Sequence, residues 1–292
     1  MIHAGLTRLP AGILRNESLG SLPNDSSLDG LAEGFVAVMD SGMGGVSVLA
    51  ALVNELPRED FSYFGDCANT PYGEKPVDWV VARTREIVDG QIGRGAKAAV
   101  IACNTATSAA AAQLRAEYPD IPIVGIEPAL KPAAQALVGG RILVMATPMT
   151  LHLDKYQHLA DEWGADCRVI PLSCDGLAAA IEHEGPESDE VAAMLESLLA
   201  PYRGGIDGVV LGCTHYPLAA AAIRRAAGGV PLFDGAQGTA RQLRRVLEKG
   251  GLARDSDREG SVSFETSLGT AQAERALSEL FREYRDTIPK CK

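Results

Sequence analysis

The chain has 292 residues, of which 46% are hydrophobic and 22% charged, and a formal net charge of −11. This composition is typical of a soluble globular protein long enough for two α/β domains, and the negative charge argues against non-specific binding to nucleic acid or an anionic membrane. No apolar run approaches the ~20 residues of a membrane span, and the N-terminus lacks a secretory signal, so we expect a cytoplasmic protein.

Residues 1–34 contain Gly, Ser, Asn, Asp and Pro without sustained periodicity, which predicts a flexible extension. From residue 35, short apolar runs alternate with segments of helical periodicity, a pattern typical of parallel sheets covered by helices. The expected strands are Phe35–Asp40, Phe61–Asp66, Ala98–Ala102, Ile121–Ile126, Arg141–Ala146, Arg168–Leu172, Gly208–Gly212, Pro231–Asp234 and Ser261–Thr266. The expected helices are Val77–Ile92, Thr105–Glu117, Met149–Trp163, Asp189–Tyr202, Ala236–Glu248 and Ala271–Tyr284.

A glycine-rich turn follows the first expected strand, which ends at Asp40. The turn lacks the Lys-Ser/Thr ending of a phosphate-binding loop and the glycine spacing of a dinucleotide site. Its glycines allow a ligand carboxylate to approach backbone N–H groups closely. Asp40 would then either face the ligand or cap the next helix. The second strand leads into Pro71-Tyr72-Gly73, whose tyrosine offers a hydrogen bond, although such a segment alone also fits an ordinary turn.

Two cysteines, Cys103 and Cys213, each follow a short apolar strand and precede hydrogen-bonding residues. A thiol at a strand-to-helix junction faces the positive end of the helix, which predicts a lowered pKa and a reactive thiolate. A single cysteine of this kind is more often buried and inert. A matched pair indicates two similar halves facing one substrate, which is what the inversion of a stereocentre requires. In a cytosolic protein we expect free thiols at Cys67, Cys103, Cys167, Cys174, Cys213 and Cys291.

Five motifs follow one another along residues 35–240. They are Asp40-Ser41-Gly42-x-Gly44-Gly45, Pro71-Tyr72-Gly73, Cys103-Asn104-Thr105-Ala106-Thr107, Gly125-x-Glu127-Pro128 and Leu211-Gly212-Cys213-Thr214-His215-Tyr216-Pro217-Leu218. Together they resemble the motifs of the glutamate racemases, in the aspartate/glutamate racemase superfamily of cofactor-independent enzymes. The resemblance implies two pseudo-symmetric α/β lobes with mainly parallel sheets and an active site between them. It also implies conversion of L-glutamate to D-glutamate for peptidoglycan synthesis, without a cofactor.

The same resemblance assigns roles to individual residues. Cys103 and Cys213 would be the catalytic bases, assisted by Asp40, His215 and Glu182. The residues that would bind the substrate are Asp40, Ser41, Pro71, Tyr72, Gly73, Asn104, Thr105, Thr214 and His215. We expect no metal site, because no Cys-x-x-Cys pair occurs and the Cys213–His215 spacing is unusual for zinc.

Proline and glycine after Ile126 and around Phe233 indicate two crossings between lobes. We therefore expect a first lobe of residues 35–127 plus 236–292 and a second of 128–235. The expected partner is a small-molecule substrate, glutamate, with no nucleic acid or membrane and a possible homodimer. Three alternatives stay open: an aspartate or hydantoin racemase, a racemase-like binding or regulatory module, and a pyridoxal-phosphate enzyme.

Overall fold

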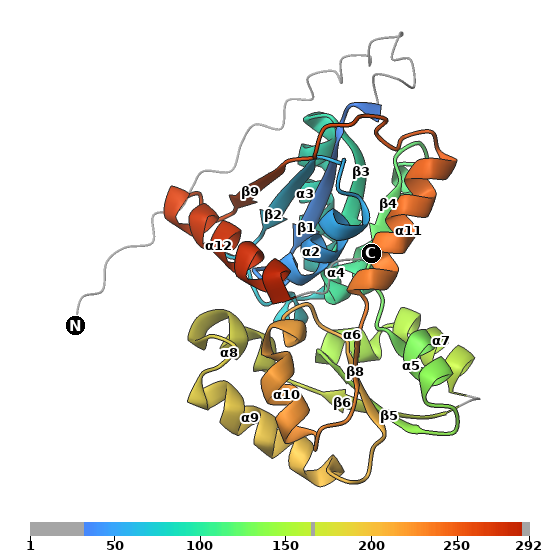
Figure 1. The fold of residues 1–292 in the computed structure, drawn as a ribbon, viewed down its shortest axis with the longest axis vertical. Helices are drawn as coiled ribbons and strands as arrows, with labels where there is room; N and C mark the ends of the chain where they lie inside the picture. The colour runs from blue at the N-terminus through green and yellow to red at the C-terminus, as the bar shows by residue number, and fades with distance from the viewer. Residues whose placement is uncertain (1–31, 165–166, 288–292) are drawn as a thin grey trace, which may run out of the picture.

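The computed structural model describes residues 32–164 and 167–287, so the extension predicted at 1–34 lies almost entirely outside the described residues. Within them the chain forms two sheets, one of five strands and one of four (Figure 1). The strands are β1 Phe35–Asp40, β2 Phe61–Gly65, β3 Ala96–Ile101, β4 Ile123–Gly125, β5 Arg141–Ala146, β6 Arg168–Ser173, β7 Gly208–Leu211, β8 Leu232–Asp234 and β9 Val262–Thr266.

Helices separate most of these strands along the chain. The α-helices are α2 Val46–Glu55, α3 Val77–Gly93, α4 Asn104–Glu117, α5 Leu130–Ala136, α6 Pro148–His152, α7 Asp154–Trp163, α8 Leu177–Glu184, α9 Asp189–Leu199, α10 Ala220–Ala226, α11 Ala236–Lys249 and α12 Ala271–Thr287. Short 3₁₀ turns are η1 Tyr72–Glu74, η2 Ala200–Tyr202 and η3 Tyr216–Ala219. None of the described helices has the length and apolar character that a membrane crossing requires.

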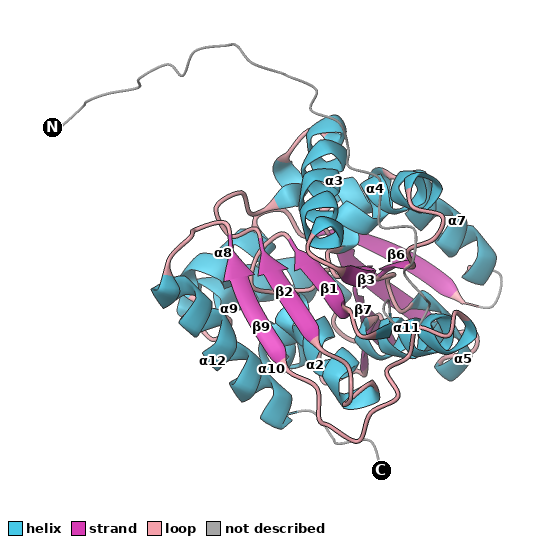
Figure 2. Ribbon diagram, turned by 90° about the horizontal axis from the view of Figure 1, so that it is seen from above, coloured by secondary structure: helices cyan, strands magenta, loops and turns pink. Residues whose placement is uncertain are grey.

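All the strand pairs in both sheets are parallel, as the alternating pattern predicted. The order is β4-β3-β1-β2-β9 in the first sheet and β6-β5-β7-β8 in the second. In Figure 2, β1, β2 and β9 lie side by side and point the same way, with α3 and α4 on one side of them. The predicted α/β class with two parallel sheets is confirmed.

Side chains alternate between the two faces of each sheet and so build separate cores. In β1, Val36 and Val38 pack with α2, α11 and α12, whereas Ala37 and Met39 pack with α3 and α4. In the second sheet, one face packs on α8, α9 and α10 and the other on α5 and α7. The strands β1, β3, β5 and β7 are therefore buried on both faces, which explains their nearly continuous apolar sequences.

One predicted helix is wrong. The segment expected as a single helix over Met149–Trp163 is divided into α6 and α7 by Leu153, whose backbone is extended at φ −80° and ψ 144°. Both helices contact α4, but α6 also lies against η1 and α7 against α5. Tertiary packing thus overrides a continuous helical periodicity.

The chain passes between the two sheets twice, after β4 and after β8. The two connections touch: a Cβ atom at Gly235 would lie 2.2 Å from the carbonyl oxygen of Glu127. The lobe boundaries at 127/128 and 235/236 stay a prediction.

Candidate active site

The candidate site lies where the carboxyl ends of the strands of the two sheets face each other. Asp40 ends β1, Cys103 follows β3, and Cys213 follows β7. The Thr214 hydroxyl donates a hydrogen bond of 3.1 Å to Oδ1 of Asp40, and the Ser47 hydroxyl donates one of 3.3 Å to the Thr214 carbonyl. These bonds join a loop of the second sheet to the first sheet, so residues distant in the sequence share one site.

Asp40 organises the glycine-rich turn. Its Oδ2 accepts hydrogen bonds from the N–H groups of Gly42 at 3.1 Å and Gly45 at 3.0 Å. A Cβ atom at position 45 would lie 2.5 Å from the Cβ of Asp40, so the turn requires glycine there. Burial, the largest influence, raises the pKa of Asp40, and the attraction of His215 does not cancel it. Asp40 therefore orders the turn before α2 and also reaches the second sheet.

The Cys103 thiol is buried at the N-terminal end of α4. It donates to the Ser41 hydroxyl at 3.5 Å, and the Ala106 N–H donates to its sulfur at 3.5 Å. Burial raises the pKa of Cys103 to about 12, and the nearby Asp40 carboxylate adds to this rise. The predicted lowering of its pKa is wrong, because removal from water disfavours the thiolate more than the helix end and the Ser41 hydroxyl favour it. At neutral pH Cys103 is therefore a protonated thiol.

Cys213 lies at the head of a buried chain of polar groups. Its sulfur is 3.7 Å from Nδ1 of His215, whose Nε2 is 2.5 Å from Glu182. Glu182 in turn accepts a hydrogen bond of 3.0 Å from the Met43 N–H, on the turn that follows β1. Burial lowers the pKa of His215, but its bonds to Cys213 and Glu182 outweigh burial and hold that pKa well above 6.5. Burial raises the pKa of Glu182, but the bond from His215 outweighs it and lowers that pKa below 4.5. The result is a buried imidazolium–carboxylate pair beside Cys213.

Asn104 and Thr105 place polar groups next to Cys103. The Asn104 side chain is buried, and within the described residues neither its Oδ1 nor its Nδ2 has a hydrogen-bond partner. The Thr105 hydroxyl lies 3.1 Å from that of Thr147, which follows β5, and Thr147 lies 2.9 Å from Thr150. A buried amide without a partner is costly unless something else satisfies it, so Asn104 is well placed to bind a polar ligand.

The Pro71-Tyr72-Gly73 turn after β2 packs against the segment that follows β5 in the second sheet. A Cβ at Gly73 would lie 2.9 Å from the Cβ of Thr147, and Pro71 and Gly73 line a narrow cavity together with Thr147 and Cys174. The Tyr72 hydroxyl points the other way and donates to the Asp66 carboxylate at 2.6 Å. Sequence reasoning missed Asp66, although this residue directly follows β2, the kind of position that identified the other candidates.

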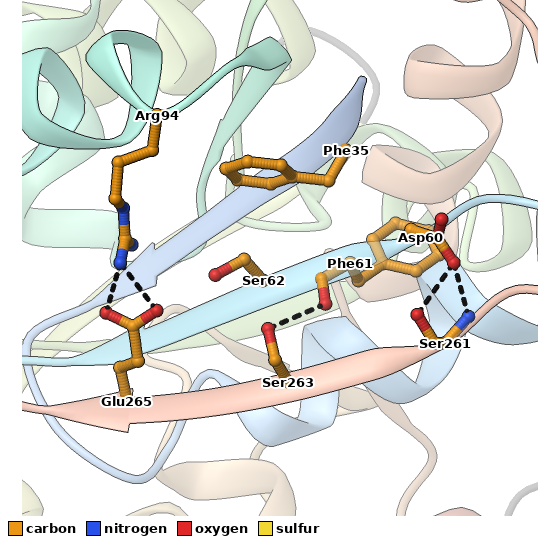
Figure 3. A pocket seen from close by; sticks show the side chains of 8 residues that line it. All are labelled: Phe35, Asp60, Phe61, Ser62, Arg94, Ser261, Ser263 and Glu265. Carbon is orange, nitrogen blue, oxygen red and sulfur yellow. Dashed lines mark hydrogen bonds and ion pairs between the residues drawn. The ribbon is translucent and has the colours of Figure 1, made fainter. Parts of the chain in front are cut away.

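A separate cavity of about 270 Å³ lies over β1, β2 and β9, away from the thiols (Figure 3). Phe35, Ser62 and Ser263 line it, and the Arg94–Glu265 ion pair spans one side. None of the predicted site residues lines this cavity.

The structure thus brings the predicted catalytic and substrate-binding residues to facing edges of the two sheets. Cys103 and Cys213 lie close enough that charge on Cys213 raises the pKa of Cys103. The arrangement offers two thiols with different neighbours, Asp40 on one side and His215 on the other. Two such groups can exchange protons with a single carbon atom placed between them. The role of each residue stays a prediction.

Comparison with known proteins is consistent with this geometry. Residues 47–243 match the family model "Asp/Glu/Hydantoin racemase". The chain is 43% identical over 242 residues to a glutamate racemase of Clostridium perfringens, covering 82% of this chain and 93% of the relative. It is 44% identical over 235 residues to that of Clostridium novyi, covering 80% and 91%.

Solved structures of glutamate racemases share the fold. The structure of isoform RacE1 from Bacillus anthracis superposes with a TM-score of 0.76 at 30% identity, covering 86% of this chain and 94% of that one. The Escherichia coli enzyme, solved with L-glutamate and the activator UDP-MurNAc-Ala, gives a TM-score of 0.74 at 29% identity, covering 86% and 95%.

Proposed function

The chain belongs to the Asp/Glu/hydantoin racemase family of isomerases, and we propose that it interconverts L- and D-glutamate by exchanging the Cα proton with Cys103 and Cys213. The proposal depends above all on one observation: two buried thiols follow strands of two different sheets and meet at facing edges. We infer the substrate, glutamate, from the relatives that are named glutamate racemase.

In the proposed reaction one thiolate removes the Cα proton, so that the Cα–H bond breaks and an S–H bond forms. The opposite thiol then donates its proton to the other face of the same carbon, which leaves that sulfur as the thiolate. No pyridoxal phosphate takes part. Backbone N–H groups and helix ends near Ser41, Asn104 and Thr214 would hold the α-carboxylate and oppose the negative charge that develops on the substrate. A dry pocket would strengthen each of these interactions.

The two thiols have unequal neighbours. A protonated His215 donates from Nδ1 toward Cys213, which stabilises negative charge on that sulfur. Cys103 is held as the neutral thiol by burial and by the Asp40 carboxylate. Cys103 is thereby prepared as an acid before substrate arrives, and a positively charged substrate ammonium group would ease its later ionisation.

The first test is incubation of the pure protein, free of metal and added cofactor, with L-glutamate and separately with L-aspartate. Chiral chromatography should show racemisation of glutamate. Faster turnover of aspartate would instead support the related aspartate activity. Racemisation of neither would contradict the proposed function and favour a binding or regulatory module.

The second test separates the two thiols. Replacing Cys103 or Cys213 with serine should abolish most racemisation, because inversion needs an acid and a base on opposite faces of one carbon. A glutamate analogue with a leaving group on Cβ needs only one proton abstraction to eliminate. Each variant should therefore eliminate only the enantiomer whose proton faces its remaining thiol, and the two should prefer opposite enantiomers. The same preference in both variants would contradict the two-thiol mechanism.

The product, D-glutamate, would supply peptidoglycan synthesis in the cytoplasm. We propose no nucleic-acid or membrane partner, and a homodimer as the assembled form.

A further inference from the structure

Asp66 is a fully buried carboxylate that the proposed proton transfer does not use. It directly follows β2 and precedes the turn that faces the second sheet. Its Oδ1 accepts hydrogen bonds from Asn69 Nδ2 at 2.9 Å and Arg83 Nη2 at 2.8 Å. Its Oδ2 accepts from the Tyr72 hydroxyl at 2.6 Å and Arg83 Nε at 2.8 Å. Four donors thus satisfy both oxygen atoms; Tyr72 belongs to the turn, and Asn69 lies just before it.

Arg83 is the cation that makes this buried carboxylate stable. Its guanidinium group contacts both oxygens of Asp66 from α3, in the bidentate geometry that gives arginine–carboxylate pairs their directionality. The Arg83 side chain is 20% exposed and Asp66 not at all, so the pair is screened far less than a surface ion pair. The hydrogen bonds outweigh burial and hold the pKa of Asp66 below its usual value.

The anchored turn faces the candidate site on its other side. Pro71 and Gly73 line the narrow cavity with Thr147 and Asp175, which lie on loops of the second sheet. Tyr72, between them, is buried with its hydroxyl on Asp66 and its ring edge-on to Trp79, with the two ring centroids 5.4 Å apart. Any displacement of Tyr72 therefore moves a wall of this narrow cavity, whose residue Thr147 also contacts Thr105 beside Cys103.

We propose that Arg83 is a positioning residue: by clamping Asp66 it fixes the Pro71-Tyr72-Gly73 turn, and so sets how tightly the amino-acid substrate binds. This inference rests on the proposed function for its substrate. Within the described part of the chain the ion-pair partners of Arg83 are Asp66 and Glu86, not the groups that would move the proton, Cys103, Cys213 and His215. Its loss should consequently raise KM and leave kcat nearly unchanged.

The test uses Arg83→Met, Arg83→Lys and Tyr72→Phe in the full chain. Arg83→Met should raise KM for glutamate about tenfold with kcat within about threefold, the size expected for losing hydrogen bonds to a charged group. Arg83→Lys keeps the charge but not the bidentate geometry, and should recover part of the KM. Tyr72→Phe removes one hydroxyl without changing the packing volume, and stays informative if Arg83→Met folds poorly. The effect of Arg83→Met should shrink in a Tyr72→Phe background, because both act through Asp66.

Arg85→Met is the matched control. Arg85 lies on the same helix and holds Glu117 through two bonds of 2.8 Å, but both side chains are about one-third exposed and neither belongs to the turn. This variant should keep the KM of the parent protein. The proposal would be overturned if KM rose equally in the Arg85 and Arg83 variants, or if KM were unchanged in Arg83→Met and Tyr72→Phe. It would also be overturned if kcat fell by as large a factor as KM rose.

The fluorescence emission of Trp79 provides a measurement that does not depend on turnover. In a Trp163→Phe background Trp79 is the only tryptophan of the chain, and it touches the Tyr72 ring. Its emission should shift in Arg83→Met and not in Arg85→Met. If the parent protein does not racemise glutamate but this shift occurs, the proposed substrate fails and the anchoring of the turn stands. If racemisation occurs without the shift, the anchoring fails and the proposed function stands.

Discussion

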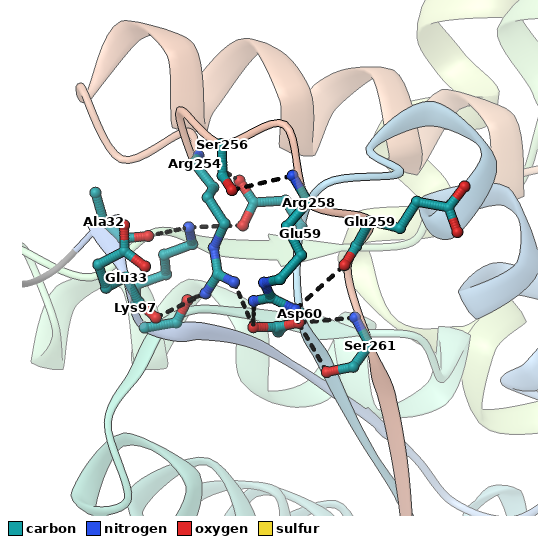
Figure 4. A network of polar contacts seen from close by, with 11 residues as sticks. Ala32, Glu33, Glu59, Asp60, Lys97, Arg254, Ser256, Arg258, Glu259 and Ser261 are labelled. Carbon is teal, nitrogen blue, oxygen red and sulfur yellow. Dashed lines mark hydrogen bonds and ion pairs between the residues drawn. The ribbon is translucent and has the colours of Figure 1, made fainter.

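Replacing Lys97 with methionine is expected to destabilise the first sheet strongly while leaving the chemistry of the site intact. Lys97 lies on β3, with its ammonium group 2.6 Å from the Glu59 carboxylate and 2.6 Å from the carbonyl oxygen of Ala32 (Figure 4). The Lys97 side chain is 0% exposed and that of Glu59 2%. Glu59 also accepts a hydrogen bond of 2.8 Å from the backbone N–H of Arg254. These contacts join the start of β1, the middle of the sheet and the segment before β9.

The size of the effect follows from the burial. Methionine has nearly the length of lysine but cannot neutralise Glu59, so a buried carboxylate loses its cation. Breaking a buried pair in this way costs about 3–5 kcal/mol, or about 6–20 °C in unfolding temperature for a chain of this size. Adding Glu59→Gln removes the stranded charge but keeps an acceptor for the Arg254 N–H, and should recover at least half of the loss.

Thermal unfolding followed by circular dichroism measures these changes. The matched control is Lys155→Met, because Lys155 pairs with Glu127 at 2.9 Å but the two side chains are 28% and 52% exposed. Such a surface pair contributes at most about 1 kcal/mol. A Lys97→Met protein that unfolds within the range of this control would refute the reasoning that the buried pair stabilises the sheet. At temperatures where the variant is folded, its KM should equal that of the parent.

Three further predictions concern the ends and the assisting groups. Deletion of residues 1–30 should leave the unfolding temperature and turnover nearly unchanged, because these residues precede the first strand and lack periodic apolar positions; loss of soluble expression would contradict this. Asp40→Asn and His215→Asn should lower kcat far more than they raise KM. The loss of kcat should differ between the L-to-D and D-to-L directions, because each residue neighbours a different thiol. Progress curves started from each enantiomer measure this loss, and equal losses in both directions would contradict the assignment of each residue to one thiol. The raised pKa of His215 adds stability that is complete below pH 6.5 and is lost as pH rises through that raised pKa. Unfolding temperatures should therefore fall more steeply above pH 6.5 in the parent than in His215→Asn, and parallel curves would contradict the buried ion pair.

The strands and the meeting of the two thiols were predictable because both depend on local pattern and on the chirality of parallel sheets. A short β-branched run such as that before Cys213 has few alternatives to a buried strand, and parallel strands deliver the next residue to one edge. The racemase fold could then be predicted because five motifs of that family occur in the family's order. The break at Leu153 was not predictable, since the residue is neither Pro nor Gly and the break accompanies the packing of α6 on η1 and of α7 on α5.

The directions of the pKa shifts in the site could not be predicted from the sequence either. A helix N-terminus beside Cys103 predicted a lower pKa, but the actual direction depends on how completely the surrounding elements exclude water from the sulfur. The Asp66–Arg83 pair likewise exists only because α3 folds back along the sheet and presents its arginine to the end of β2. Local pattern places a residue at a strand end, and tertiary packing decides its partners.

The contact between Gly235 and Glu127 has a consequence for motion. Both chain segments that join the two sheets within the described residues pass through this point, backbone against backbone. Because the two links are in contact, any rotation of one sheet relative to the other would have to turn about this point. A small angular opening would separate Thr214 from Asp40 and Glu182 from Met43 while β4 and β8 stayed in place. Any side chain at position 235 would push the two links apart and so strain these hydrogen bonds between the sheets.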